Sequence, residues 1–184
     1  MSVTELRRIV PSVVSVVALA MGVSACGDDK SYAVPDRLCG VSVEPALLKP
    51  LLPAGEELKA EPRYVGDDEF PGSEGALRCM VTVDGKNALY IQEFSGQNSF
   101  DALEHAREMG FDRNPQKVDG MTNAVIADGK FLAVTPCGEK GKKSQVLDIE
   151  MIMPIGEAKD LRDELERFAT AYLPAGKKNA GCEK

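Results

Sequence analysis

Apolar and polar residues alternate with a period of two in several short stretches of this sequence. In the clearest of them, every second residue from Leu77 to Val83 is apolar or cysteine, which is typical of a strand with one buried face. Similar stretches cover residues 88–91, 123–127, 131–135 and 146–153. Asp84-Gly85 and Asp128-Gly129 join neighbouring stretches, and both residue types tolerate the positive φ of tight hairpin turns. The pattern predicts an antiparallel sheet of about five strands built from hairpins.

Apolar residues recur at spacings of three and four near the C-terminal end of the chain. Over Glu157–Tyr172 this spacing predicts an amphipathic helix with one buried stripe. Pro174 and Gly176 follow, and we expect them to end the helix because both residue types are poor helix formers.

Two shorter helices are indicated by residues that favour helix ends. Ser42 can cap a helix that reaches Leu48, and Asn98 or Ser99 can cap one that Gly110 ends. Residues 54–75 are rich in Gly, Pro and acidic residues, so they are predicted to form a long surface loop. This order of helices and hairpins predicts an α+β fold with the helices packed on one face of the sheet.

The first 25 residues have the layout of an export signal. Arg7 and Arg8 are followed by an apolar run up to Ala20, as in the charged and apolar regions of signal peptides. The run is shorter than the roughly 20 residues that span the hydrocarbon core of a bilayer. We therefore expect a removable signal peptide rather than a permanent transmembrane helix.

The signal ends in Val23-Ser24-Ala25-Cys26, which resembles the lipobox of bacterial lipoproteins. The resemblance implies that the Cys26 thiol carries a diacylglyceryl group and that the signal is cut before this residue. The alternative is an ordinary secretory signal followed by a cysteine by chance. On the lipoprotein interpretation, residues 1–25 are removed, residues 26–38 form a lipidated N-terminus and a polar tether, and residues 39–184 form a single domain. That domain is expected on the extracytoplasmic face of the cell membrane, held there by acyl chains such as palmitate.

The chain is acidic. It has 22 Lys and Arg against 29 Asp and Glu, a formal net charge of −7. Residues 1–25 contain two of the basic residues and one of the acidic residues, so the remainder is near −8. This charge argues against nucleic-acid binding and against electrostatic docking on anionic lipid. The absence of Trp disfavours a stacking platform for sugars or bases.

Four cysteines follow Cys26 in the chain: Cys39, Cys79, Cys137 and Cys182. An even number in an exported protein predicts two disulfides, with three possible pairings. We favour Cys39–Cys79 and Cys137–Cys182, because each pair then links an irregular end of the chain to a strand. The alternative is a zinc site, but CxxC spacing is absent and the single histidine is distant in sequence from the cysteines. No metal site is predicted.

Other candidate reactive groups have ordinary explanations. His105 lies opposite the apolar side of its predicted helix, so we expect it to face solvent. Residues 67–69 lack the ligand spacing of a calcium loop, and we interpret them as a solvated acidic loop. Ser95-Gly96 lacks the pattern of a nucleophile elbow. Residues 138–143 lack that of a phosphate loop, although their lysines could contact an acidic partner. No catalytic residue and no cofactor are predicted.

Further motifs are similar to those of small cell-envelope lipoproteins that are abundant in actinobacteria. They are Leu38-Cys39-Gly40-Val41-Ser42, the stretch from Leu47 to Pro53, and Thr135-Pro136-Cys137. The resemblance implies a location at the cell envelope, and it implies no activity and no site residues.

Three functions are compatible with this sequence. The leading hypothesis is a non-enzymatic, membrane-tethered binding or protein-interaction module. Its partners would be the membrane, through the lipid on Cys26, and another envelope protein. The second is a small cell-envelope enzyme that uses carboxylates such as Glu69 or Asp148. The third is a carrier of a lipid or small apolar ligand beneath the sheet.

Overall fold

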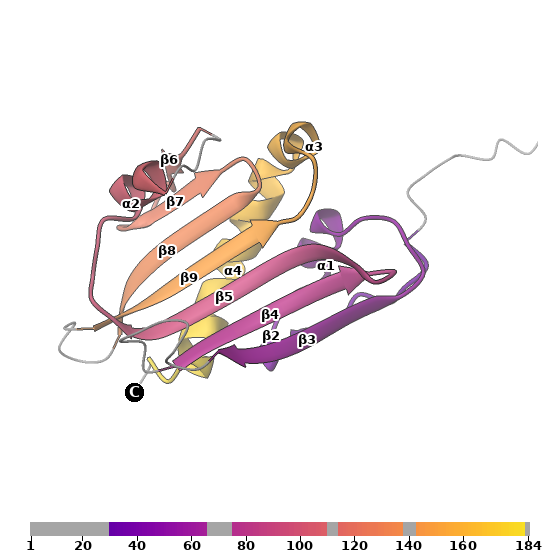
Figure 1. The fold of residues 1–184 in the computed structure, drawn as a ribbon, viewed down its shortest axis with the longest axis horizontal. Coiled ribbons are helices and arrows are strands. Elements are labelled where there is room, and N and C mark those ends of the chain that lie inside the picture. Colours follow the sequence, from indigo (N-terminus) through magenta and orange to yellow (C-terminus); the bar gives the residue numbers. More distant parts are fainter. Residues whose placement is uncertain (1–29, 66–74, 110–113, 138–142, 183–184) are drawn as a thin grey trace, which may run out of the picture.

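The computed structural model describes residues 30–65, 75–109, 114–137 and 143–182, which form an α+β domain (Figure 1). Its main element is an antiparallel sheet of seven strands in the order β3-β4-β5-β9-β8-β7-β6. The strands are β3 (Leu58–Val65), β4 (Gly75–Val83), β5 (Lys86–Gln97), β6 (Gln116–Lys117), β7 (Ala124–Ala127), β8 (Lys130–Cys137) and β9 (Lys143–Met151). The predicted fold class and antiparallel sheet are confirmed.

The five strands expected from the alternating pattern are β4, β5, β7, β8 and β9. Asp84 and Gly85 join β4 to β5 with φ values of 50° and 73°, the left-handed region that favours these residue types in two-residue hairpins. Gly129, with φ of 79°, has the same role between β7 and β8. The predicted hairpins are therefore confirmed.

The prediction of about five strands is wrong because it misses β3 and β6. β3 lies inside the stretch expected to be a loop. It is an edge strand with one neighbour, where Pro62 is tolerated. The half-buried Leu58 and Ala60 alternate with the exposed Lys59 and Glu61, but Pro62 follows them and argues against a strand at the level of sequence. β6 has two residues, too few to produce a periodic pattern.

One face of the sheet, the α4 face, is covered by helix α4 (Arg162–Asn179), as Figure 1 shows. Leu165, Phe168 and Tyr172 of α4 belong to the main hydrophobic core, together with inward residues of the central strands such as Leu89 and Ile149. The amphipathic helix predicted from the three-four spacing thus packs as expected.

The predicted bounds of this helix are wrong. The chain forms a short α3 (Ile155–Asp160) and then α4, with Leu161 between them at φ −105° and ψ 13°. α4 also continues through Pro174, although a proline inside a helix costs about 3 kcal/mol. Leu173 and Gly176 are buried against the core on either side of Pro174, and this packing offsets the lost backbone hydrogen bond.

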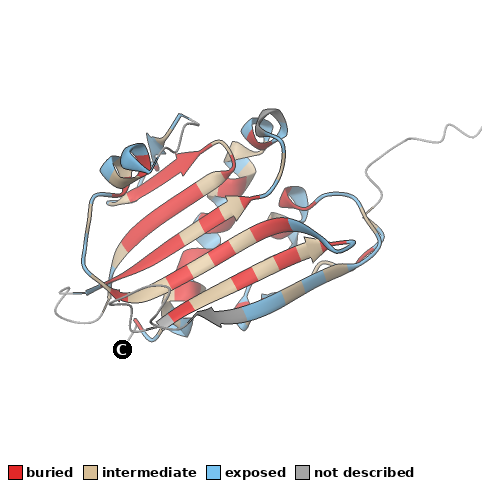
Figure 2. Ribbon diagram, viewed as in Figure 1, coloured by how far each residue is buried: buried red, intermediate tan, exposed pale blue. Residues whose placement is uncertain are grey.

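The helices do not all pack on one face, so that prediction is also wrong. α2 (Ala102–Glu108) covers the opposite face, the α2 face, at its β7–β8 end. It packs on Val125, Leu132, Val134 and Val146. Figure 2 shows long buried runs in β7, β8 and β9, whereas β4 and β5 alternate. Continuous apolar runs are typical of strands buried on both faces.

The caps of two helices differ from the prediction. In α2 the cap is Asp101, whose Oδ1 accepts a hydrogen bond from the Glu104 amide at 2.8 Å, in place of Asn98 or Ser99. Its carboxylate satisfies an amide that lacks a partner within the helix. Near the start of the described chain, β1 (Arg37–Leu38) and β2 (Val41–Ser42) form a short hairpin. This hairpin leads to α1 (Pro45–Leu48) and the 3₁₀ turn η1 (Lys49–Leu51). Glu44 occupies the N-cap position of α1 without a hydrogen bond from its side chain, and Ser42 ends β2.

The folded part begins before Cys39, where the sequence places its boundary. Lys30 forms a β-bridge with Gly55. Tyr32 is 9% exposed, and its hydroxyl donates to the Pro53 carbonyl at 2.5 Å. Leu38 is fully buried. Residues 30–38, which the sequence assigns to the tether, thus pack with the rest of the described domain.

Both favoured disulfides are confirmed. Cys39 is bonded to Cys79 on β4, and Cys137 at the end of β8 is bonded to Cys182, beyond α4. The first bond ties the N-terminal segment to the sheet. The second fixes the end of α4 against the same sheet, which keeps the helix across the α4 face.

We predict that replacing both Cys137 and Cys182 with Ala lowers the free energy of unfolding by about 4 kcal/mol, because the bond closes a long loop in the unfolded chain. Urea unfolding without reductant measures the change. The pair Cys39 and Cys79 encloses a similar sequence separation, 40 against 45 residues, so its double alanine variant should lose a similar amount. An unchanged urea midpoint for either variant would contradict this account.

Candidate functional site

A groove lies at the end of the sheet where the described chain begins. It has a volume of about 420 Å³, within the roughly 300–1,000 Å³ of small-molecule sites. We call it the N-terminal groove. It is lined by Lys30, Pro50, Leu52, Pro53, Ala54, Lys86, Asn87, Ala88, Ile152, Met153, Pro154, Glu157 and Leu161. In Figure 1, α1 and the turn between β4 and β5 lie at this end of the sheet.

Two backbone hydrogen bonds join the four segments that line the N-terminal groove. Ser31 donates from its amide to Gly55 at 3.0 Å, which fixes the first described residues against the 50–55 segment. The amide of Ile152 donates to Ala88 at 2.9 Å, which ties the chain after β9 to β5. Each segment is thus attached to the sheet or to the segment beside it.

The lining of the groove is mainly apolar, with a few polar groups among it. Ile152 is 40% exposed and is, with Met109, one of two large apolar residues exposed in the described part of the chain. Lys30 and Lys86 supply positive charge and Glu157 supplies negative charge. An apolar cavity with a few polar groups is the usual form of a ligand site.

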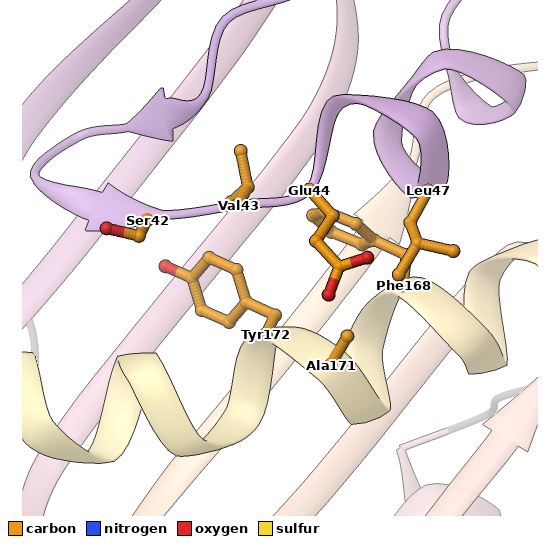
Figure 3. A pocket seen from close by; sticks show the side chains of 7 residues that line it. All are labelled: Ser42, Val43, Glu44, Leu47, Phe168, Ala171 and Tyr172. Carbon is orange, nitrogen blue, oxygen red and sulfur yellow. The ribbon is translucent and has the colours of Figure 1, made fainter.

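A second cavity, of about 220 Å³, lies between β2, α1 and α4 (Figure 3). Its lining includes Ser42, Glu44 and Tyr172. In Figure 3 the Glu44 carboxylate points toward α4, close to Phe168 and Ala171. Phe168 and Tyr172 are 1% and 2% exposed, so their rings offer little surface to a ligand. The cavity is therefore the weaker binding candidate.

A buried polar cluster lies beneath α4, beside this second cavity. The Tyr172 hydroxyl donates to Glu93 Oε1 at 2.5 Å, and Gln145 Nε2 donates to Glu93 Oε2 at 3.3 Å. Glu93 is 3% exposed, and burial raises the pKa of its carboxyl while the two hydrogen bonds lower it. Burial and the adjacent Glu93 raise the pKa of Tyr172 as well. The cluster joins α4 to β5 and β9 and is enclosed, which fits a structural role.

Asp148, the carboxylate proposed from the sequence, lies on the α2 face of β9. Its Oδ2 is 3.5 Å from Lys130 Nζ, and its side chain is 18% exposed. Burial raises the pKa of Asp148 to about 6, partly opposed by Lys130. Its neighbour across the sheet is Gln92, which accepts a hydrogen bond from Arg78 at 3.3 Å. The structure thus places Asp148 in a row of polar residues across the α2 face.

The other sequence candidates do not gather at one site. His105 is half-buried, with its ring 4.7 Å from the Phe100 ring, so the expectation that it faces solvent is met only in part. Ser95 and Gly96 lie in β5 beside an irregularity of its pairing with β9. Residues 67–69, Glu69 included, and residues 138–142 lie outside the described residues.

The buried Glu93 follows a pattern that is visible in the sequence, whereas the N-terminal groove does not. Glu93 continues the inward alternation of Leu89 and Ile91, so a longer predicted strand would have placed it in the core. The groove had no comparable signal, because its walls come from segments that are distant in sequence. Within the described residues, no group of three or more His, Cys, Asp or Glu side chains could hold a metal ion.

Comparison with known proteins gives no assignment: no family model, curated protein or solved structure matches the chain. Over the part of the chain that the structure describes, none of the helices is both long enough and apolar enough to cross a membrane.

We predict that Tyr172→Phe lowers the free energy of unfolding by about 1–3 kcal/mol, because it removes a hydrogen bond to a buried carboxyl group. Tyr90→Phe is the matched control. The Tyr90 hydroxyl accepts an exposed hydrogen bond from Asn87, and its loss should change the free energy by about 0.5 kcal/mol or less. Equal effects of the two variants in urea unfolding would show that the Tyr172–Glu93 contact does not stabilise the fold.

We predict that Asp148→Asn changes how stability depends on pH. The pKa of Asp148 is raised from 3.8 to about 6 in the folded protein. Its favourable contribution is therefore complete below pH 3.8 and is lost as the pH rises through 6. Relative to Asp148→Asn, the wild-type protein should lose at most about 3 kcal/mol over this window. Urea unfolding at several pH values measures this difference, and parallel stability curves from pH 4 to 7 would contradict it.

Proposed function

We propose that this protein is a membrane-anchored extracytoplasmic lipoprotein, and that its domain is a non-enzymatic module that binds a ligand in the N-terminal groove. The observation that carries the proposal is the position of this groove. Lys30, the first described residue, is part of its lining. A ligand site and the connection to the proposed anchor therefore share one end of the domain.

The length of the tether supports this arrangement. Cys26 precedes Lys30 by four residues, and a chain of this length spans at most about 14 Å. Lys30 is itself fixed by its bridge to Gly55 and by a hydrogen bond from Nζ to the Lys49 carbonyl at 2.7 Å. With acyl chains on Cys26, the groove would face the membrane at close range. The two disulfides fit an oxidising compartment outside the cytoplasm.

Binding is favoured over catalysis by the groups that line the groove. A catalytic site needs a nucleophile or an acid–base group held in place by a second polar group. The polar residues of this lining are two lysines, Asn87 and Glu157, and only Lys86 and Asn87 share a segment. These groups suit the orientation of a ligand.

A small cell-envelope enzyme that uses carboxylates is the second candidate, and the raised pKa of Asp148 favours it. A carboxyl group that titrates near neutral pH can serve as a general acid or base. Its contact with Lys130 at 3.5 Å is equally compatible with a structural ion pair. Turnover in a hydrolase substrate panel that disappears in Asp148→Asn would favour the enzyme over the binding module.

We predict that Cys26→Ser abolishes lipidation and leaves the fold intact. In a bacterial host supplied with a labelled fatty acid, the wild-type protein should incorporate the label on its N-terminal peptide, and the variant should not. Both proteins should retain the Cys39–Cys79 and Cys137–Cys182 linkages in peptide maps made without reductant, which controls for misfolding. Label on the variant, or none on the wild-type protein, would refute the proposed anchor.

A further inference from the structure

We propose that the ligand of the N-terminal groove is a long-chain fatty acid. Its hydrocarbon chain would lie along the apolar lining, and its carboxylate would lie near Lys86 and Lys30. This inference rests on the proposed function, because the lipid anchor would hold the groove beside a bilayer that contains such acids. The argument depends on the size of the groove, its exposed apolar residue and the charge of its lining.

The apolar part of the groove is suited to one acyl chain. Leu52 and Ala88 are buried in its lining, and Met153 and Leu161 are half-buried. Ile152 exposes 40% of its surface and can contact an apolar ligand in the groove. A volume of about 420 Å³ lies near the lower end of the range for small-molecule sites. This size favours a ligand with one chain over a diacyl lipid.

The charge of the lining favours an anion. Lys30 and Lys86 contribute two positive charges against one negative charge from Glu157, on a chain whose net charge is −7. Lys86 is exposed, and its positive charge also acts on the Asp84 carboxylate, which accepts hydrogen bonds from the Glu56 and Glu57 amides.

A fatty acid can also move between a bilayer and a protein site. A single acyl chain is bound to a membrane only marginally and reversibly, whereas two chains give stable attachment. The chains on Cys26 would therefore remain in the bilayer, and a free single-chain acid would be available to the groove. Transfer needs no covalent step.

Equilibrium binding of tritiated palmitate tests the proposal directly. The protein is residues 26–184 with Cys26→Ser, which contains every described residue. Uncharged hexadecanol provides the comparison ligand with the same chain length. We expect saturable binding of one palmitate per protein and weaker binding of hexadecanol. Absence of palmitate binding, or equal affinity for the two ligands, would overturn the proposal.

Two variants at exposed positions locate the ligand. Ile152→Glu places a carboxylate among the apolar residues and should weaken palmitate binding at least about tenfold. Met109→Glu is its control, because Met109 is the other exposed large apolar residue and lies beside α2. If both variants bind palmitate as tightly as the parent protein, the groove is not the site.

Charge reversal tests the position of the carboxylate. Lys86→Glu should weaken palmitate binding about tenfold and leave hexadecanol binding unchanged. Lys178→Glu is the control. It lies 17 residues beyond Leu161 along α4, about 25 Å from the groove, and it should change neither affinity. Equal effects of the two reversals would refute a specific contact between Lys86 and the carboxylate.

The outcome for the ligand can be separated from the outcome for the anchor. If Cys26 carries no lipid but the soluble protein binds palmitate through Ile152 and Lys86, the anchor fails and the fatty-acid site stands. If Cys26 is lipidated but palmitate does not bind, the anchor stands and the fatty-acid site fails. Tighter binding of lysophosphatidylglycerol than of palmitate would also overturn the assignment, because it would identify a phospholipid as the ligand.

Discussion

The packing of α4 on the sheet is the interaction on which the rest of the structure depends. Leu165, Phe168 and Tyr172 cover the inward side chains of the central strands, and burial of each such residue contributes roughly 1.5–3 kcal/mol. The Tyr172–Glu93 hydrogen bond attaches the middle of α4 to the sheet, and the Cys137–Cys182 disulfide attaches the chain just beyond its C-terminal end. At its other end, Leu161 precedes α4 and lines the N-terminal groove. The position of α4 thus contributes directly to the shape of the proposed binding site.

The sequence was sufficient to predict features that depend on local patterns. Alternation identified five strands, the Asp-Gly dipeptides identified two hairpins, and the three-four spacing identified the helix that covers the sheet. It was insufficient where tertiary contacts override local preference. The continuation of α4 through Pro174 depends on buried neighbours such as Leu173, and the edge strand β3 depends on pairing with β4. The continuous apolar runs of β7 and β8 indicate burial on both faces, but they do not identify α2 as the helix that covers the second face.

The candidate site was harder to predict than the fold. Cysteine number and position led to the two correct disulfides, because each of these pairs links an irregular end of the chain to a strand. The N-terminal groove, by contrast, is assembled from four segments between Lys30 and Leu161, and no motif connects them. Lys86 and Ile152 have ordinary sequence contexts, and their common position emerges only when the hairpin turn and the segment after β9 meet beside the 50–54 segment. The proposed ligand site is therefore a property of the tertiary structure.

The central claim of this account is that ligand binding occurs at the end of the domain where the tether begins. Hydrogen exchange of residues 26–184 with Cys26→Ser, measured with and without palmitate, tests it most directly. We expect slower exchange of backbone amides in residues 51–54, 86–88 and 152–153 when palmitate is present, and no change near Lys178. Protection confined to Ser42–Leu47 and the adjoining part of α4, or to the α2 face around Asp148, would contradict the claim, as would identical exchange in both samples.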